Sequence, residues 1–205
     1  MKVILVNGSP REKGCTYTAL CEIEKVLKSE GIEAEIFWIG NKPIAGCIGC
    51  GSCRKTGKCF VDDKVNEFNK LAVEADGFIF GSPVHYAAAS GAMTSFMDRA
   101  FYSGSSFSHK PAAAIVSARR GGTTAAFEQL NKYFTISQMP VVSSRYWNMV
   151  HGSCPEDVLK DEEGIQTMRI LAKNMVWLLK SIEAGEKAGI CTPEKETPVR
   201  TNFIR

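Results

Sequence analysis

The stretch KVILVNGSP at residues 2–10 decides the fold of this chain. Its first six residues form a nearly continuous apolar run, which is typical of a strand buried on both faces of a parallel sheet. The glycine, serine and proline that follow end the run, as expected where a buried strand leaves its sheet through a loop. Apolar residues then recur at helical spacing, and this pattern predicts a helix over about residues 16–30.

The alternation of strand and helix continues along the chain. Apolar runs predict further strands at residues 35–39, 77–81, 111–117 and 140–142. Helices are expected at 62–75 with Asp62 or Asp63 as N-cap, from Met93 to Ala100, from an N-cap at Thr123 or Thr124, and at 164–183. This order predicts an α/β fold with three layers and a doubly wound, five-stranded parallel sheet. We expect residues 1–185 to form one domain and residues 186–205 a C-terminal tail, partly mobile or docked on a neighbour.

Composition excludes several classes of protein. With 205 residues, 44% hydrophobic and 23% charged, the chain is neither disordered, collagen-like nor a coiled coil. Its net charge of +3 comes from scattered side chains, so we expect no nucleic-acid partner. No apolar run approaches the length of a membrane span, and the first ten residues are too quickly interrupted for a signal peptide. We therefore expect a cytoplasmic protein with no membrane partner.

The loop after the first strand, residues 8–18, carries groups that suit a phosphate. The hydroxyls of Ser9, Thr16 and Thr18, the guanidinium of Arg11 and the N-terminus of the following helix all supply donors or positive charge. The loop matches neither the Walker pattern nor G-x-G-x-x-G, so the sequence favours one terminal phosphate dianion over a nucleoside triphosphate or a dinucleotide. The alternative interpretation is that Ser and Thr only cap the helix.

Two further loops follow buried strands and are expected at the same edge of the sheet. The first is GSPVHYAAAS at residues 81–90, where small residues behind Pro83, His85 and Tyr86 would admit a flat heterocycle; the two rings could instead pack on a neighbouring loop. The second is SARRGGTT at residues 117–124, whose cations and free N–H groups suit the negative charge of a reduced flavin. We expect one of its two arginines to be a solvated surface charge.

Taken in order, NGSPR with a following G-x-T, then GSPV-x-Y, then ARRGG resemble the flavodoxin-like NAD(P)H-dependent FMN reductases over residues 1–183. The resemblance implies that FMN is the cofactor. It implies phosphate contacts from Ser9, Arg11, Thr16 and Thr18, a flavin edge along Pro83, Val84, His85 and Tyr86, and a pyrimidine end near Ala118, Arg119, Arg120, Gly121 and Gly122. The sequence departs from the family pattern at Cys15 in the phosphate loop and at His85.

Four cysteines lie close together in the sequence, at Cys47, Cys50, Cys53 and Cys59. Their C-x2-C-x2-C-x5-C spacing is closer to ferredoxin-type ligation than to the two separated pairs of a zinc site, and nearby lysines and arginine would offset thiolate charge. The segment resembles the cluster loop of iron–sulfur flavoproteins, which implies a [4Fe–4S] cluster that passes electrons to FMN. Zinc and free thiols remain the alternatives. We expect the other four cysteines to be structural.

These features predict an FMN-dependent oxidoreductase that takes hydride from NAD(P)H and passes electrons to a small-molecule acceptor such as a flavin, a quinone, or an azo or nitro compound. No side chain is expected to act as acid or base in the first half-reaction. One rival hypothesis is an electron-transfer flavoprotein that serves a protein partner, and the net charge of +3 argues against it. The other rival is a zinc-stabilised structural module. The mixed aromatic and polar stretch at residues 146–150 suits an interface, and the family resemblance implies a homodimer or homotetramer.

Overall fold

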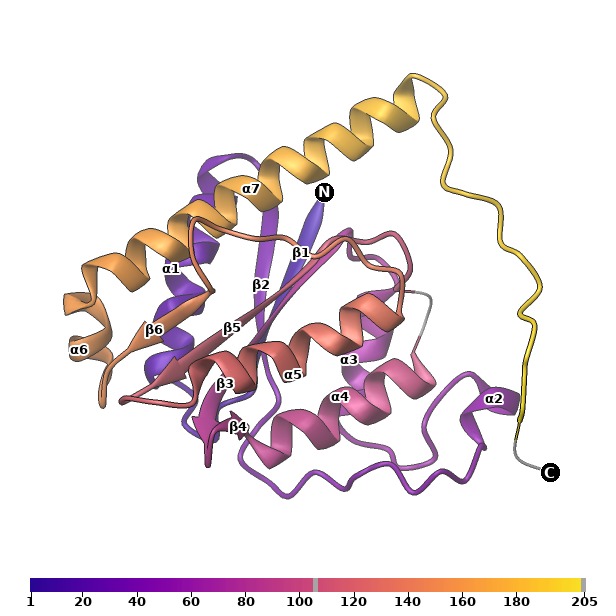
Figure 1. The fold of residues 1–205 in the computed structure, drawn as a ribbon, viewed down its shortest axis with the longest axis horizontal. Helices are drawn as coiled ribbons and strands as arrows, with labels where there is room; N and C mark the ends of the chain where they lie inside the picture. Colours follow the sequence, from indigo (N-terminus) through magenta and orange to yellow (C-terminus); the bar gives the residue numbers. More distant parts are fainter. Residues whose placement is uncertain (105–106, 204–205) are drawn as a thin grey trace.

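The computed structural model describes residues 1–104 and 107–203. Within these residues, five strands form a parallel sheet in the order β2-β1-β3-β5-β6 (Figure 1). The strands are β1 (Lys2–Asn7), β2 (Glu33–Trp38), β3 (Gly77–His85), β5 (Ala112–Ala118) and β6 (Met149–His151). A short strand, β4 (Ala88–Ala89), pairs antiparallel with the end of β3. This strand order is the doubly wound, flavodoxin-like one, and it confirms the predicted fold class.

Helices cover both faces of the sheet. One layer contains α1 (Cys15–Ser29), α6 (Pro155–Lys160) and α7 (Glu162–Lys187). The opposite layer contains α3 (Lys64–Ala72), α4 (Gly91–Ser103) and α5 (Thr123–Ile136). The one-turn helix α2 (Cys53–Thr56) lies in the long loop after β2, away from the sheet (Figure 1). The helix at residues 16–30 and the Asp63 N-cap of α3, whose carboxylate accepts from the Val65 N–H, are confirmed.

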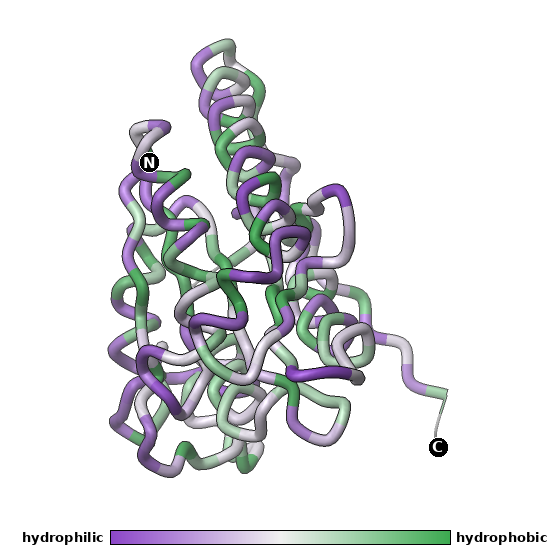
Figure 2. Tube along the Cα trace, turned by 90° about the vertical axis from the view of Figure 1, so that its left-hand side faces the viewer, coloured by the Kyte–Doolittle hydropathy of each residue, from purple (hydrophilic) through white to green (hydrophobic). Residues whose placement is uncertain are grey.

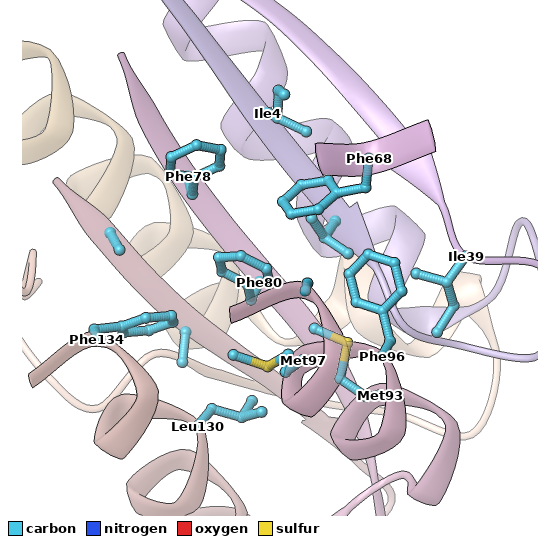
Figure 3. Packing of buried hydrophobic residues seen from close by; sticks show 14 of the residues in the cluster. Ile4, Ile39, Phe68, Phe78, Phe80, Met93, Phe96, Met97, Leu130 and Phe134 are labelled. Atoms are coloured by element: carbon cyan, nitrogen blue, oxygen red, sulfur yellow. The ribbon is translucent and has the colours of Figure 1, made fainter. Parts of the chain in front are cut away.

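The core explains why the strands are apolar along their whole length. Phe78 and Phe80 of β3 contact Phe68 of α3 at ring-centroid distances of 6.0 and 5.9 Å, and Phe80 also lies 5.4 Å from Phe134 of α5 (Figure 3). Ile79, between them in sequence, is buried on the opposite face against α1 and α7. Because successive side chains of a strand point to opposite faces, a strand covered on both sides needs apolar residues at every position.

Helix α7 is amphipathic, and its end alternates between hydrophilic and hydrophobic colours in Figure 2. It ends at Lys187, two residues beyond the predicted domain boundary, and residues 190–203 then run as an exposed segment without regular structure. Along the described residues, no helix combines the length and the hydropathy needed to cross a membrane.

The prediction of a strand at residues 140–142 is wrong. Val141 forms only an isolated bridge with Ala112, and the fifth parallel strand is β6 at residues 149–151. Between these two contacts the Asn148 side chain is buried and donates to the Ala114 carbonyl at 3.1 Å, so a side-chain amide takes the place of a backbone ladder bond. The apolar residues on either side therefore belong to two separate contacts with β5.

Two smaller expectations also change. Gly122, and neither threonine, is the N-cap of α5, because this glycine turns the chain with a φ of +93° and no side chain caps the described first turn. The stretch at residues 146–150 is divided: Tyr146 and Trp147 are half exposed, whereas the three residues that follow them are buried in or beside β6. Only the two aromatic residues are therefore free to contribute to an interface.

Candidate functional site

A cavity of about 340 Å³ lies at the carboxyl ends of the parallel strands. We call it the strand-end cavity. It is lined by Ser9, Pro10, Arg11, Cys15, Thr16, Pro83, Val84, His85, Ser117, Ala118, Arg119, Gly152 and Ser153. The loops after β1, β3 and β5 thus converge on one space, as the sequence predicted. Gly152 and Ser153, which follow β6, also line this cavity. They were not predicted, because the fifth strand was expected at residues 140–142 and not directly before them.

The loop after β1 is held rigid from within. Asn7 is fully buried, accepts from the Ser9 N–H at 3.1 Å and donates to the Glu12 carbonyl at 2.8 Å. The indole N–H of Trp38 donates to the Ser9 carbonyl at 2.7 Å, and the Arg11 N–H donates to the Ser9 hydroxyl at 3.1 Å. A loop fixed in this way loses little conformational entropy when a ligand binds.

Helix α1 begins at this loop and presents its N-terminus to the cavity. Among the described residues, no side chain caps it and its first turn contains no acidic residue, so its positive end remains available to an anion. Thr16 lies on the cavity wall, where its hydroxyl is 2.8 Å from that of Ser117. Thr18, also predicted as a phosphate contact, instead donates its hydroxyl to the Gly14 carbonyl and does not line the cavity.

Cys15 lies on the cavity wall next to the loop that follows β6. Burial raises the pKa of its thiol, which is near the Gly152 carbonyl at 3.7 Å. The side chain is therefore a neutral thiol at physiological pH. At this position it adds a small, weakly polar group to the wall and no negative charge that would repel a phosphate.

The second loop forms a β-hairpin between β3 and β4. Pro83, Val84 and His85 line the cavity, whereas Tyr86 is fully exposed at the tip and does not. Tyr86 and Ala87 both have positive φ, +50° and +59°, which is the conformation of a two-residue hairpin turn that usually contains Asn or Gly. The sequence therefore carried no signal for β4.

The two arginines of the third loop differ in their position relative to the strand-end cavity. Ala118 and Arg119 line the cavity, while Arg120, Gly121 and Gly122 lie outside its wall. Gly122 has a different role, because a Cβ atom there would lie 2.7 Å from the Cα of Ala87 in the hairpin turn. The absence of a side chain lets the second and third loops pack directly against each other.

Two buried serines connect the first and second loops. The Ser90 hydroxyl donates to the Gly8 carbonyl at 3.1 Å, and the Ser90 N–H donates to the Ser82 hydroxyl at 3.0 Å. Gly8 itself donates its N–H to the Gly81 carbonyl, and a Cβ on Gly8 would lie 2.5 Å from the Met93 sulfur. These contacts place the phosphate-type loop and the hairpin in fixed positions relative to each other.

A second cavity, of about 110 Å³, is lined by all four clustered cysteines. This cysteine cavity is also lined by Arg99 and Tyr102, in the C-terminal half of α4, whereas Ser90, the N-cap of α4, donates to the Gly8 carbonyl in the loop after β1. No described residue that lines the cysteine cavity also lines the strand-end cavity, so the two are separate sites. In the described part of the chain, no three His, Cys, Asp or Glu side chains are gathered closely enough to hold a metal ion.

The cysteines differ in their contacts. The Cys53 thiol is 3.6 Å from the Tyr102 carbonyl, and Cys59 accepts from Nε of Arg99 at 3.3 Å. The backbone N–H of Ser52 lowers the pKa of the Cys50 thiol, and its side chain lowers it further. The loop is therefore exposed on the side of Cys47 and Cys50 and fastened to α4 on the other side.

Arg99 is the buried charge beneath this loop. Its side chain is 1% exposed and makes a two-pronged contact with Asp63, at 2.6 and 2.9 Å. Burial acts to lower its pKa, but hydrogen bonds to Asp63 and Cys59 outweigh burial and raise the pKa above its usual value. No sequence pattern predicts this role for Arg99, because a lone arginine on an amphipathic helix gives no signal of its partners.

The family model of the NADPH-dependent FMN reductases matches residues 1–153. The chain belongs to this family. Family membership makes it a flavin-dependent oxidoreductase whose cofactor is FMN. The chain is 35% identical over 192 residues to an iron–sulfur flavoprotein of Methanocaldococcus jannaschii, with 89% of this chain and 100% of the relative covered.

Two solved structures share the fold of this family member. RosB, solved with a bound 8-demethyl-8-formylriboflavin-5'-phosphate intermediate, superimposes with a TM-score of 0.70 at 13% identity, over 100% of this chain and 92% of RosB. A flavodoxin from the domain Archaea superimposes with a TM-score of 0.59 at 18% identity, over 88% of this chain and 99% of the flavodoxin. At these identities the likeness concerns the fold alone, and it agrees with the flavodoxin-like strand order.

Proposed function

We propose that this FMN reductase family member takes hydride from NAD(P)H and passes the electrons to a small acceptor such as a flavin, a quinone, or an azo or nitro compound. The observation that carries the proposal is the convergence of three loops on one cavity, where the first loop supplies anion-binding groups and the other two supply apolar and cationic groups. FMN, when bound, supplies the two-electron chemistry.

Different residues of the strand-end cavity would bind different parts of FMN. The N-terminus of α1, with Ser9, Thr16 and the nearby guanidinium of Arg11, forms the phosphate end. Pro83 and Val84 supply half-buried apolar atoms that exclude water from one ring edge. Arg119 brings positive charge to the end of β5, where it would stabilise negative charge that appears on reduction.

Titration of the metal-free protein with FMN tests this assignment. Arg11→Ala removes one charge-assisted contact and is expected to weaken FMN binding by about 1.5–3 kcal/mol, which is about ten- to a hundred-fold in Kd. Lys13→Ala is the matched control, because Lys13 is an exposed cation in the same loop that does not line the cavity. Unchanged FMN affinity in Arg11→Ala, or tighter binding of FAD than of FMN, would refute the assignment of the phosphate end.

We further propose that Cys47, Cys50, Cys53 and Cys59 hold a [4Fe–4S] cluster. Their shared cavity, their spacing and the 35% identity to an iron–sulfur flavoprotein support the proposal. Because the thiols are not gathered as a ligand set here, the loop has to close around the cluster. The guanidinium of Arg99 and the exposed lysines of the loop would offset the negative charge of four thiolates.

Anaerobic purification with iron and acid-labile sulfide analysis tests the cluster. We expect stoichiometric iron and sulfide, and we expect Cys50→Ala to release or remodel the cluster while FMN stays bound in the other cavity. Cys191→Ala is the control, since Cys191 is exposed in the tail far along the chain. Stoichiometric zinc without a visible charge-transfer band would contradict the cluster and favour a zinc site. Absence of metal together with accessible thiols would contradict the cluster and favour free thiols.

One observation favours a second function, electron transfer with a protein partner. Ile48, Phe60 and Tyr102 are 72%, 59% and 57% exposed, and all three line the cysteine cavity. Exposed apolar side chains around a redox site suit a docking surface. Anaerobic mixing distinguishes the functions: bleaching of the bound flavin by NADH or NADPH supports the reductase, whereas bleaching by dithionite but by neither nucleotide supports the carrier.

We also propose that the protein assembles as a homodimer or homotetramer. Tyr146 and Trp147 are half exposed, with ring centroids 4.9 Å apart, next to the edge strand β6. Light scattering on the wild type and on Trp147→Ser tests this, and a monomeric wild type would refute it. The absence of nucleic-acid and membrane partners and the cytoplasmic location stay predictions from the sequence.

A further inference from the structure

One guanidinium fastens both ends of the cysteine loop. Arg99 donates from Nη1 to the Ala45 carbonyl at 3.4 Å and from Nη2 to the Val61 carbonyl at 2.9 Å. Ala45 lies two residues before the first of the four cysteines, and Val61 lies two residues after the last. The whole ligand segment is therefore closed at its base by a single side chain of α4.

The same side chain also reaches a sulfur. Nε of Arg99 donates to the Cys59 sulfur at 3.3 Å, and the remaining face of the guanidinium is paired with the carboxylate of Asp63. The Asp63 side chain is 28% exposed, and it also caps α3 by accepting from the Val65 N–H. A purely structural fastening would need the backbone contacts and the ion pair, but not the N–H···S contact.

We propose that Arg99 and Asp63 form a positioning pair that sets the reduction potential of the cluster held by the cysteine loop. This inference rests on the proposed [4Fe–4S] cluster. The pair acts through Cys59 and does not bind iron itself. Hydrogen bonds to the sulfurs and the net charge nearby are two of the factors that fix the potential of an iron–sulfur cluster.

The two members of the pair act in opposite directions. One-electron reduction, with dithionite as the electron donor, adds one negative charge to the cluster and transfers no proton or heavy atom. The N–H donor and positive charge of Arg99 stabilise the added charge, and the carboxylate of Asp63 opposes it. Removal of the arginine should therefore lower the potential, and neutralisation of the aspartate should raise it.

The experiment compares cluster potentials of anaerobically reconstituted holoprotein by spectroelectrochemical titration. The variants are Arg99→Gln, Asp63→Asn and the double substitution, which leaves no unpaired buried charge; asparagine can still cap α3. Lys58→Gln is the matched control, because it removes an exposed cation from the same loop, where solvent and salt screen the charge. Iron and sulfide are measured for each protein.

We expect a lower potential in Arg99→Gln, a higher potential in Asp63→Asn, and an intermediate value in the double variant, with both single shifts larger than that of Lys58→Gln. If Arg99→Gln does not fold, the test rests on Asp63→Asn. A cluster potential that is not raised in Asp63→Asn then overturns the proposal. In proteins with full iron and sulfide content, two outcomes overturn this inference and leave the proposed cluster standing. One is a shift of the potential with the same sign in both single variants, and the other is shifts no larger than that of Lys58→Gln. A wild type that holds no iron or sulfide overturns the proposed cluster, and this inference with it.

Discussion

Gly122→Ala tests whether the third loop supports the hairpin of the second loop. Gly122 has a φ of +93°, a conformation that costs an L-residue about 1–2 kcal/mol. The new Cβ would also lie 2.7 Å from Ala87 Cα, 3.0 Å from Ala87 Cβ and 3.1 Å from Val84 Cγ1, so the hairpin has to move, at about 1–3 kcal/mol. We expect a loss of about 3 kcal/mol in the free energy of unfolding.

Thermal unfolding and FMN titration measure this effect. For a chain of this size, about 3 kcal/mol corresponds to a decrease in Tm of about 6–12 °C. FMN affinity should fall as well, because Val84 lines the strand-end cavity and moves with the hairpin.

Gly121→Ala is the control for this test. A Cβ at Gly121 meets no atom within 4 Å, and its φ is outside the positive range, so we expect a change of at most about 1 kcal/mol. Equal effects of Gly121→Ala and Gly122→Ala would refute the argument that the hairpin requires a glycine at position 122.

Two further predictions follow from charges in the two cavities. Arg119→Ala should lower the two-electron potential of bound flavin by about 10–20 mV, which corresponds to about 0.5–1 kcal/mol for an exposed charge, whereas Arg120→Ala, outside the cavity wall, should leave it unchanged; equal potentials in both variants would place the flavin elsewhere. In metal-free protein at pH 8, iodoacetamide should label Cys50 faster than Cys15, because a backbone N–H lowers the pKa of the first thiol and burial raises that of the second; mass spectrometry measures the order, and the reverse order would contradict it.

The periodicity of the sequence was sufficient to predict the fold class and the edge of the sheet at which the strand-end cavity lies. A strand covered on both faces needs apolar residues throughout, as in β1, and an aspartate before an amphipathic run favours an N-cap, as at Asp63, so local chemistry predicts both. The three loops were placed together because the carboxyl ends of parallel strands share one edge. Which side chains of those loops line the cavity could not be derived in this way.

Long-range contacts decided the rest, since they join residues that no local pattern relates. The chain from residue 140 to residue 151 meets β5 twice, at Val141 and at β6, and the Asn148 side chain donates to the Ala114 carbonyl of β5 between these contacts. Arg99 meets Asp63 across 36 positions and Cys59 across 40. A buried cation is stable only with such partners, and the sequence gives no sign of the pairing until α3, α4 and the cysteine loop pack together.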